Sequence, residues 1–169
     1  LAYEAPYTKS AKNPVDKNYY SESSTQVALN AGVNTVYCIP FDATYRAAND
    51  KAWLNHDYLE VGERVGYAYT RMEAETYGIT NNYPDIKTDD GRYSGGAAVG
   101  GASWSSLFAY DAYKEGVDLS GQPYVQYRVK ADTAGDYMLK IGYLFGERGN
   151  AADQYMIVFV NGKTAYKAM

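Results

Sequence analysis

Apolar and polar residues alternate with a period of two along much of the chain, and this pattern predicts β-strands. In residues 124–132 the alternation places Val125, Tyr127 and Val129 on one face of a strand. The apolar face of the next predicted strand consists of Tyr137, Leu139, Ile141 and Tyr143. The predicted strands are residues 25–41 (two strands joined at Asn30-Ala31-Gly32), 53–61, 124–132, 136–145 and 154–160.

Residues 154–160 are nearly all apolar, which predicts a central strand that is covered on both faces. Asn161-Gly162 then predicts a hairpin turn, with residues 163–169 as the return strand. Segments rich in Gly, Asn, Asp and Ser predict loops at 10–24, 42–52, 80–106, 114–123 and 146–153. No segment predicts a helix of three turns. The pattern therefore predicts an all-β domain, either a sandwich or a jelly roll.

Composition narrows the possible partners. The chain has 169 residues, which suits one domain with a real core, and its net charge is −4. This mildly acidic balance argues against nucleic acid and against an anionic membrane surface as partners. There is no apolar run of roughly 18 residues that could span a bilayer. No signal peptide is identified and the chain starts at Leu1, so we expect a mature product or a fragment.

The 20 tyrosines far exceed the 4 phenylalanines and 2 tryptophans. Tyrosine suits a half-buried sheet, and it also provides a flat platform for ligands such as sugar rings. Enzymatic motifs are missing: the single histidine, His56, and the single cysteine, Cys38, stand in no catalytic context. We therefore expect a protein that is not an enzyme, with Cys38 as a buried core residue.

Two glutamates stand two residues apart in RMEAETYG (71–78). If this segment is a strand, Glu73 and Glu75 lie on one face and repel each other. A bound hard cation such as calcium would explain the pair, because calcium prefers carboxylate and carbonyl oxygens. The alternative is that one glutamate is solvated and the other pairs with Arg71 or a lysine.

Several motifs together resemble carbohydrate-binding modules of families 6 and 35. Glu-Ala-Glu at 73–75, followed by GRYSGGAAVGG at 91–101, is similar to the opening of such a module. Residues 117–146 and 153–163 resemble its middle strands. VALNAGVNTVYCIPF (27–41) and WLNHDYLEV (53–61) resemble its closing elements, yet they stand first in this chain.

The resemblance implies a single galactose-binding-like jelly-roll β-sandwich over residues 1–169, in circularly permuted order. Residues 1–61 resemble the C-terminal part of the module, and residues 62–169 its N-terminal part. The short connection 61–67 would join the two at little cost in loop entropy. Read cyclically, KTAYKAM and LAYEAPYT form one alternating stretch. The two parts either close on each other or complete the sheet of a neighbouring copy.

The resemblance also implies the site residues. Those of a structural calcium are Glu73, Glu75 and Asp57, and those of a glycan cleft among the loops are Trp104, Tyr93, Trp53 and Asn55. His56 is expected on the face of its strand opposite to Asn55. The function implied is carbohydrate binding by a secreted, lectin-like module that binds a polysaccharide or glycan. The alternative is a structural subunit or tandem repeat of an extracellular filament or surface assembly, built from the same fold by strand exchange or head-to-tail contacts.

Overall fold

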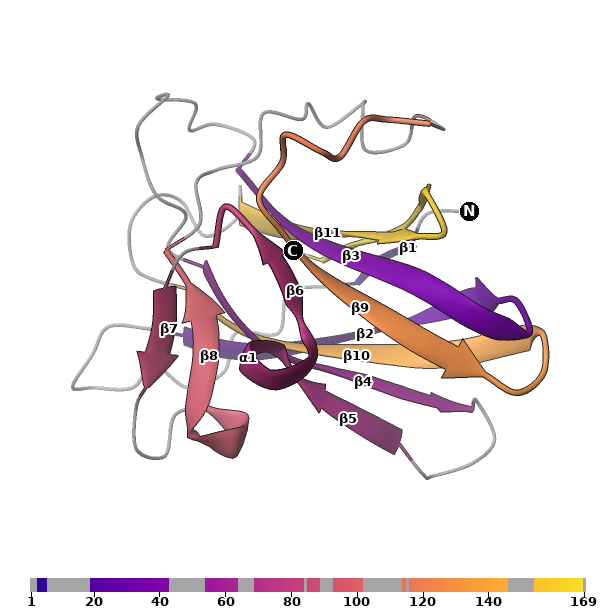
Figure 1. Ribbon diagram of the computed structural model, residues 1–169, viewed down its shortest axis with the longest axis horizontal. Coiled ribbons are helices and arrows are strands. Elements are labelled where there is room, and N and C mark those ends of the chain that lie inside the picture. The colour runs from indigo at the N-terminus through magenta and orange to yellow at the C-terminus, as the bar shows by residue number, and fades with distance from the viewer. Residues whose placement is uncertain are drawn as a thin grey trace.

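The chain forms two β-sheets that pack face to face (Figure 1). The computed structural model describes residues 3–5, 19–42, 54–63, 69–83, 85–88, 93–101, 114, 116–145 and 154–168. The first sheet has the order β1 (Tyr3–Ala5), β12 (Lys163–Ala168), β11 (Gln154–Val160), β3 (Gly32–Asp42), β9 (Tyr124–Ala131) and β6 (Ile79–Asn81). The second has the order β2 (Tyr19–Leu29), β10 (Gly135–Phe145), β4 (Leu54–Glu63), β8 (Ala97–Gly100) and β7 (Asp85–Thr88), and β5 (Tyr69–Glu73) also pairs with β4.

This arrangement confirms the all-β sandwich at the level of two sheets. The strand pairs are antiparallel apart from β1 with β12, which run parallel. The described helical elements are one four-residue turn, α1 (Ala74–Tyr77), and one 3₁₀ turn, η1 (Ser94–Gly96). None of the described helices has the length and apolarity needed to cross a bilayer.

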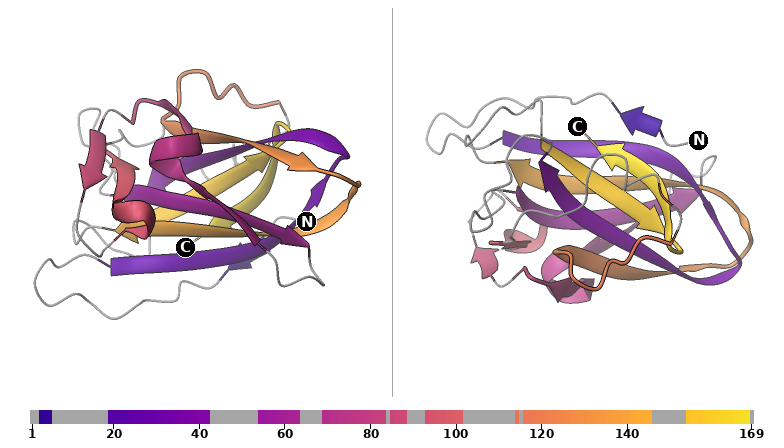
Figure 2. Two further views of the ribbon diagram at one scale, coloured as in Figure 1. Left: turned by 60° about the horizontal axis from the view of Figure 1, so that its bottom comes forward. Right: turned by 90° about the horizontal axis from the view of Figure 1, so that it is seen from above.

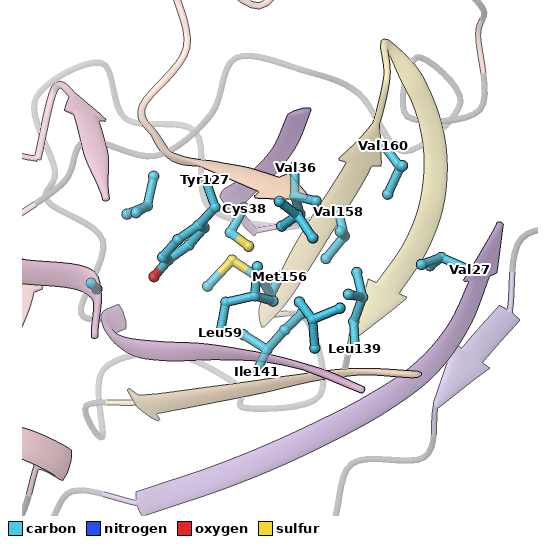
Figure 3. Packing of buried hydrophobic residues seen from close by; sticks show 14 of the residues in the cluster. Val27, Val36, Cys38, Leu59, Tyr127, Leu139, Ile141, Met156, Val158 and Val160 are labelled. Carbon is cyan, nitrogen blue, oxygen red and sulfur yellow. The ribbon is translucent and has the colours of Figure 1, made fainter. Parts of the chain in front are cut away.

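The core lies between the two sheets and follows the predicted alternation (Figure 3). Val125, Tyr127 and Val129 of β9 are all buried, as predicted. The predicted apolar face of β10 is buried as well and consists of Tyr137, Leu139, Ile141 and Tyr143. Side chains two residues apart point to the same side of a strand, so every second residue enters the core.

Strand β11 is covered on both faces, which confirms its predicted central position. Met156, Val158 and Val160 belong to the main core, whereas Ile157 and Phe159 form a second cluster with Ile39 on the outer face of the sheet. Partly buried side chains that cover this second cluster include Tyr37, Val117, Leu119 and Tyr124. In Figure 1 the chain that leads into β9 passes over this face.

The hairpin turn at Asn161-Gly162 is confirmed. Both residues have positive φ, 52° for Asn161 and 79° for Gly162, as a two-residue turn between antiparallel strands requires. The Asn161 side chain also fixes the turn to β3, because its Oδ1 accepts a hydrogen bond of 2.9 Å from the backbone N–H of Thr35.

Three expectations from the sequence need correction. The predicted loop at 80–106 contains β7, β8 and the end of β6, and the predicted loop at 10–24 already contains the start of β2. The segment 71–78 is a strand only as far as Glu73, because α1 starts at the next residue. The backbone N–H of Gly78 closes this helical turn on Ala74 O at 3.0 Å.

Both sheets contain strands from residues 1–61 and from residues 62–169. β3 lies between β11 and β9, and β4 lies between β10 and β8. The segments KTAYKAM and LAYEAPYT contribute β12 and β1, which lie side by side in parallel rather than end to end (Figure 2). Each part of the chain therefore supplies edges that the other part pairs with in this structure.

Candidate functional site

Strands β4 and β5 bring the predicted calcium ligands into one neighbourhood. In this antiparallel pair Glu73 lies opposite Tyr58, the residue that follows Asp57. Asp57 is fully buried, and Glu75 stands in the first turn of α1, two residues after Glu73. Because β5, α1 and β4 are neighbours, the three acidic residues lie near one another in space. We call Asp57, Glu73 and Glu75 the carboxylate cluster.

The turn at residues 93–96 lies against the carboxylate cluster. The backbone N–H of Ser94 donates to Asp57 Oδ2 at 3.1 Å, and Ser94 Oγ donates to Glu73 Oε1 at 2.7 Å. Gly95 packs over both glutamates: a Cβ at this position would lie 3.2 Å from Glu75 Oε1 and 3.4 Å from Glu73 Cδ. The turn thus contacts all three members of the cluster.

Two oxygens of the cluster are buried without compensation. Glu73 Oε2 and Glu75 Oε2 have no hydrogen-bond partner in the part of the chain that the structure describes. Buried carboxylate oxygens normally have a hydrogen bond or a counter-charge. Burial raises the pKa of Glu75 and repulsion from Glu73 raises it further, although a backbone hydrogen bond opposes the shift. Both observations indicate that a positive charge would be favourable between the two glutamates.

Arg71 does not supply that charge directly. Its guanidinium forms an ion pair with Glu60, with 2.6 Å between Nε and Oε1, and stacks over the Tyr58 ring at 4.0 Å. Its Nη1 donates to Ser94 Oγ at 2.6 Å, and Glu73 adds a weaker electrostatic attraction. Across the described residues no ion pair joins Arg71 to either glutamate, so the Arg71 part of the alternative expectation is not met.

The cluster fits a hard cation in its chemistry. Within the described ranges no group of three or more His, Cys, Asp and Glu side chains meets the criteria for a metal site. The two glutamate oxygens without a described partner are nevertheless of the ligand type that calcium prefers, since calcium binds carboxylate oxygens. The residues that would hold the ion are Asp57, Glu73 and Glu75.

Two of the four predicted glycan-binding residues lie together beside the cluster. Asn55 Nδ2 donates to Tyr93 OH at 2.9 Å, and both side chains are partly buried. Gly100 makes room for the amide, because a Cβ there would lie 2.2 Å from Asn55 Oδ1. Trp53 and Trp104 lie outside the described residues.

Two grooves occur elsewhere on the described surface. One has a volume of about 480 Å³ and lies between the segment 117–120, β3 and the Asn161-Gly162 turn. The other, of about 510 Å³, lies between β5 and β9. Neither is lined by Tyr93 or Asn55, so neither coincides with the predicted glycan cleft.

His56 is fully buried, and its Nε2 shares a hydrogen bond of 2.7 Å with Tyr127 OH. Burial lowers its pKa from 6.5 to about 3, because an imidazolium is poorly solvated in the core. Cys38 is buried, as expected, and burial raises the pKa of its thiol far above the usual range. Both groups are therefore uncharged at neutral pH and have no solvent exposure.

Acid should destabilise the protein through His56. The unfolded chain takes up a proton below pH 6.5 while the folded chain does not until about pH 3, so stability falls as the pH drops through this window. The expected slope is about 1.4 kcal/mol per pH unit. Urea unfolding of the wild type and of His56→Gln, both with a chelator, should show their stability difference shifting in favour of the variant as the pH falls from 5.5 to about 4.5. Parallel pH profiles would contradict this prediction.

The sequence did not identify Ser94 and Gly95 as site residues. Their signal is the run Ser94-Gly95-Gly96: consecutive glycines allow positive φ and close approach of the backbone, and Gly95 and Gly96 have φ of 66° and 86°. The short side chains at this turn let it contact the carboxylates. No known protein family, curated protein or solved structure matches this chain.

Proposed function

We propose that this protein is a secreted, non-catalytic carbohydrate-binding module that is stabilised by calcium. The observation that carries the proposal is the shared construction of the two candidate sites. Asn55 and Asp57 stand two residues apart on β4, and Tyr93 and Ser94 are neighbours in the turn that covers the cluster. An ion and a sugar would therefore be bound by the same two segments.

The pairing of β4 with β5 supports a circularly permuted jelly roll. In the modules that the sequence resembles, the strand with the Glu-x-Glu motif opens the domain and the strand with the aspartate closes it. Here β5 and β4 are paired neighbours, with Glu73 opposite Tyr58. Joining two such adjacent ends by a short connection costs little loop entropy.

Calcium would neutralise the carboxylate cluster and tie its elements together. When bound, the ion supplies positive charge to Glu73 and Glu75, whose buried Oε2 atoms have no hydrogen-bond partner among the described residues. Asp57 would connect it to β4, and the glutamates would connect it to β5 and α1. The proposed role is structural, because the ion would link two strands and a helical turn.

Sugar recognition would combine stacking with hydrogen bonds. One face of a pyranose is apolar and packs on an aromatic ring, while its hydroxyl groups need polar partners. Asn55 and Tyr93 OH are polar groups of this kind and hold each other in place. Trp104 follows Gly101 by three residues and is the proposed stacking platform, with Trp53 immediately before β4 as the second aromatic ring.

A glycan array with the full chain in calcium-containing buffer tests the proposal. We expect binding to at least one class of glycan, and Trp104→Ala should weaken it at least about tenfold, equivalent to about 1.4 kcal/mol. Tyr77→Ala is the matched control, because Tyr77 is 60% exposed and lies outside the proposed cleft. Both variants should keep the wild-type circular dichroism spectrum. Failure of the wild type to bind any glycan would overturn the proposal.

A further inference from the structure

Strand β4 contains an irregularity at Asp57, a member of the carboxylate cluster. The pairing of β4 with β10 runs regularly until Gly142 opposite Tyr58, and then Tyr143 lies opposite His56, so the register skips Asp57. Successive residues in a regular strand point to opposite faces. A β-bulge of this kind re-aims a side chain, and Asp57 is the extra residue here. Both Asp57 and His56 are fully buried, and the residues that follow them on β4 as far as Gly62 are buried as well.

A hydrogen bond from the opposite sheet holds one side of this bulge. Tyr127 lies on β9, is fully buried, and its hydroxyl is 2.7 Å from His56 Nε2. In Figure 3 the hydroxyl of Tyr127 points away from the labelled aliphatic side chains. His56 Nδ1 is buried with no hydrogen-bond partner among the described residues. The bond to Tyr127 is therefore the polar contact that the described structure gives this imidazole.

The other side of the bulge carries Asp57. Its Oδ2 accepts from the backbone N–H of Ser94 at 3.1 Å, and Ser94 in turn bonds Glu73. Because a bulge changes the direction of the side chain that it displaces, the position of Asp57 in this network depends on the register of β4 at this point. The carboxylates of Glu75 and Asp57 also contribute, after burial and Cys38, to raising the pKa of Tyr127, which agrees with their closeness to its hydroxyl.

We propose that Tyr127, acting through His56, is a positioning residue that fixes the β4 bulge and so directs Asp57 into the carboxylate cluster. The inference rests on the proposed calcium site, and it adds two residues that no sequence motif singled out as part of it. Residues that orient a metal ligand from behind typically change metal affinity 10- to 100-fold when they are removed. A buried hydrogen bond that only stabilised the fold would change stability and leave the affinity for calcium unaltered.

The test compares Tyr127→Phe with Tyr137→Phe. Both changes remove one hydroxyl from a buried tyrosine, but Tyr137 OH bonds Thr133 O at 2.8 Å in a β-turn region instead of His56. Calcium affinity is measured by isothermal titration calorimetry on the full chain. We expect Tyr127→Phe to weaken binding at least about tenfold and Tyr137→Phe to leave it unchanged.

A spectroscopic readout separates positioning from stability. Direct excitation of bound Eu³⁺ reports through its luminescence lifetimes in H₂O and D₂O how many waters coordinate the ion. If Asp57 is displaced, Tyr127→Phe should gain about one coordinated water, since water replaces a lost oxygen ligand. Wild-type affinity and hydration in Tyr127→Phe would overturn the proposal.

His56 provides a second route if Tyr127→Phe does not fold. His56→Gln keeps a group that can hydrogen-bond Tyr127, so its calcium affinity should stay near that of the wild type, whereas His56→Leu should lose at least about tenfold. Equal affinity and hydration for the two variants would contradict the proposal. Absence of calcium binding by the wild type itself would instead refute the calcium site of the proposed function.

Discussion

Calcium should raise the melting temperature of the wild type by roughly 5 to 11 °C over the value in a chelator. This follows from mass action: an ion at 100 times its Kd stabilises the folded state by about 2.7 kcal/mol. The reason lies in Glu73 and Glu75, whose buried oxygens have no hydrogen-bond partner in the described structure. The double variant Glu73→Gln/Glu75→Gln should show no calcium response.

Without calcium, the double variant Glu73→Gln/Glu75→Gln should have a higher melting temperature than the wild type. In the chelator the two carboxylates repel each other, and burial, together with this repulsion, raises the pKa of Glu75. Replacing the charges by neutral amides removes the repulsion, so the variant should melt above the wild type in the chelator and below it in calcium. Glu63→Gln on the exposed end of β4 is the control and should keep the full calcium response. Identical melting curves of the wild type with and without calcium would refute the ion site.

Gly78→Ala should cost about 3 kcal/mol of unfolding free energy, because it overpacks a closed corner of the core. A Cβ at Gly78 would lie 2.5 Å from Ala74 O and 2.5 Å from Val125 Cγ1, and Val125 is fully buried. The backbone of Gly78, with φ −76° and ψ 131°, suits any residue. The cost therefore comes from contact alone, and relief of the clash would have to move α1, which carries Glu75.

Gly121→Ala is the matched control for this change. Gly121 has no positive φ and no atom within 4 Å of the added Cβ. Its substitution should leave the protein unchanged or more stable by up to about 1 kcal/mol, through the unfolded state. Urea unfolding measures both variants. A Gly78→Ala protein as stable as the control would show that the turn between α1 and β6 is not tightly packed.

The sequence predicted two kinds of strand. One kind has an apolar face and a polar face, and the other consists almost entirely of apolar residues. β9 alternates over its whole length, β10 alternates over residues 137–141, and β11 is nearly all apolar, so period and composition were sufficient. The turn at Asn161-Gly162 was predictable because these two residue types adopt positive φ readily. Each of these signals is local and independent of the partner strand.

The missed elements depend on contacts that a local pattern does not contain. β6, β7 and β8 have three or four residues each, so they are too short to show a recognisable alternation of apolar and polar residues. The bulge at Asp57 is set by the register of β4 against Gly142 and Tyr143 on β10. In the candidate site, the sequence identified Glu73, Glu75, Asp57, Tyr93 and Asn55, but Ser94, which connects Asp57 to Glu73, became evident only from their hydrogen bonds.

The parallel pair of β1 and β12 gives the domain a defined response to force. Tyr3 lies opposite Tyr166 and Ala5 opposite Ala168. Tension transmitted through the chain before β1 and after β12 would pull these strands in opposite directions along their common axis. Their evenly spaced hydrogen bonds would then carry the load together in shear instead of opening one after another. This geometry would slow unfolding under force and would have less effect on the equilibrium stability.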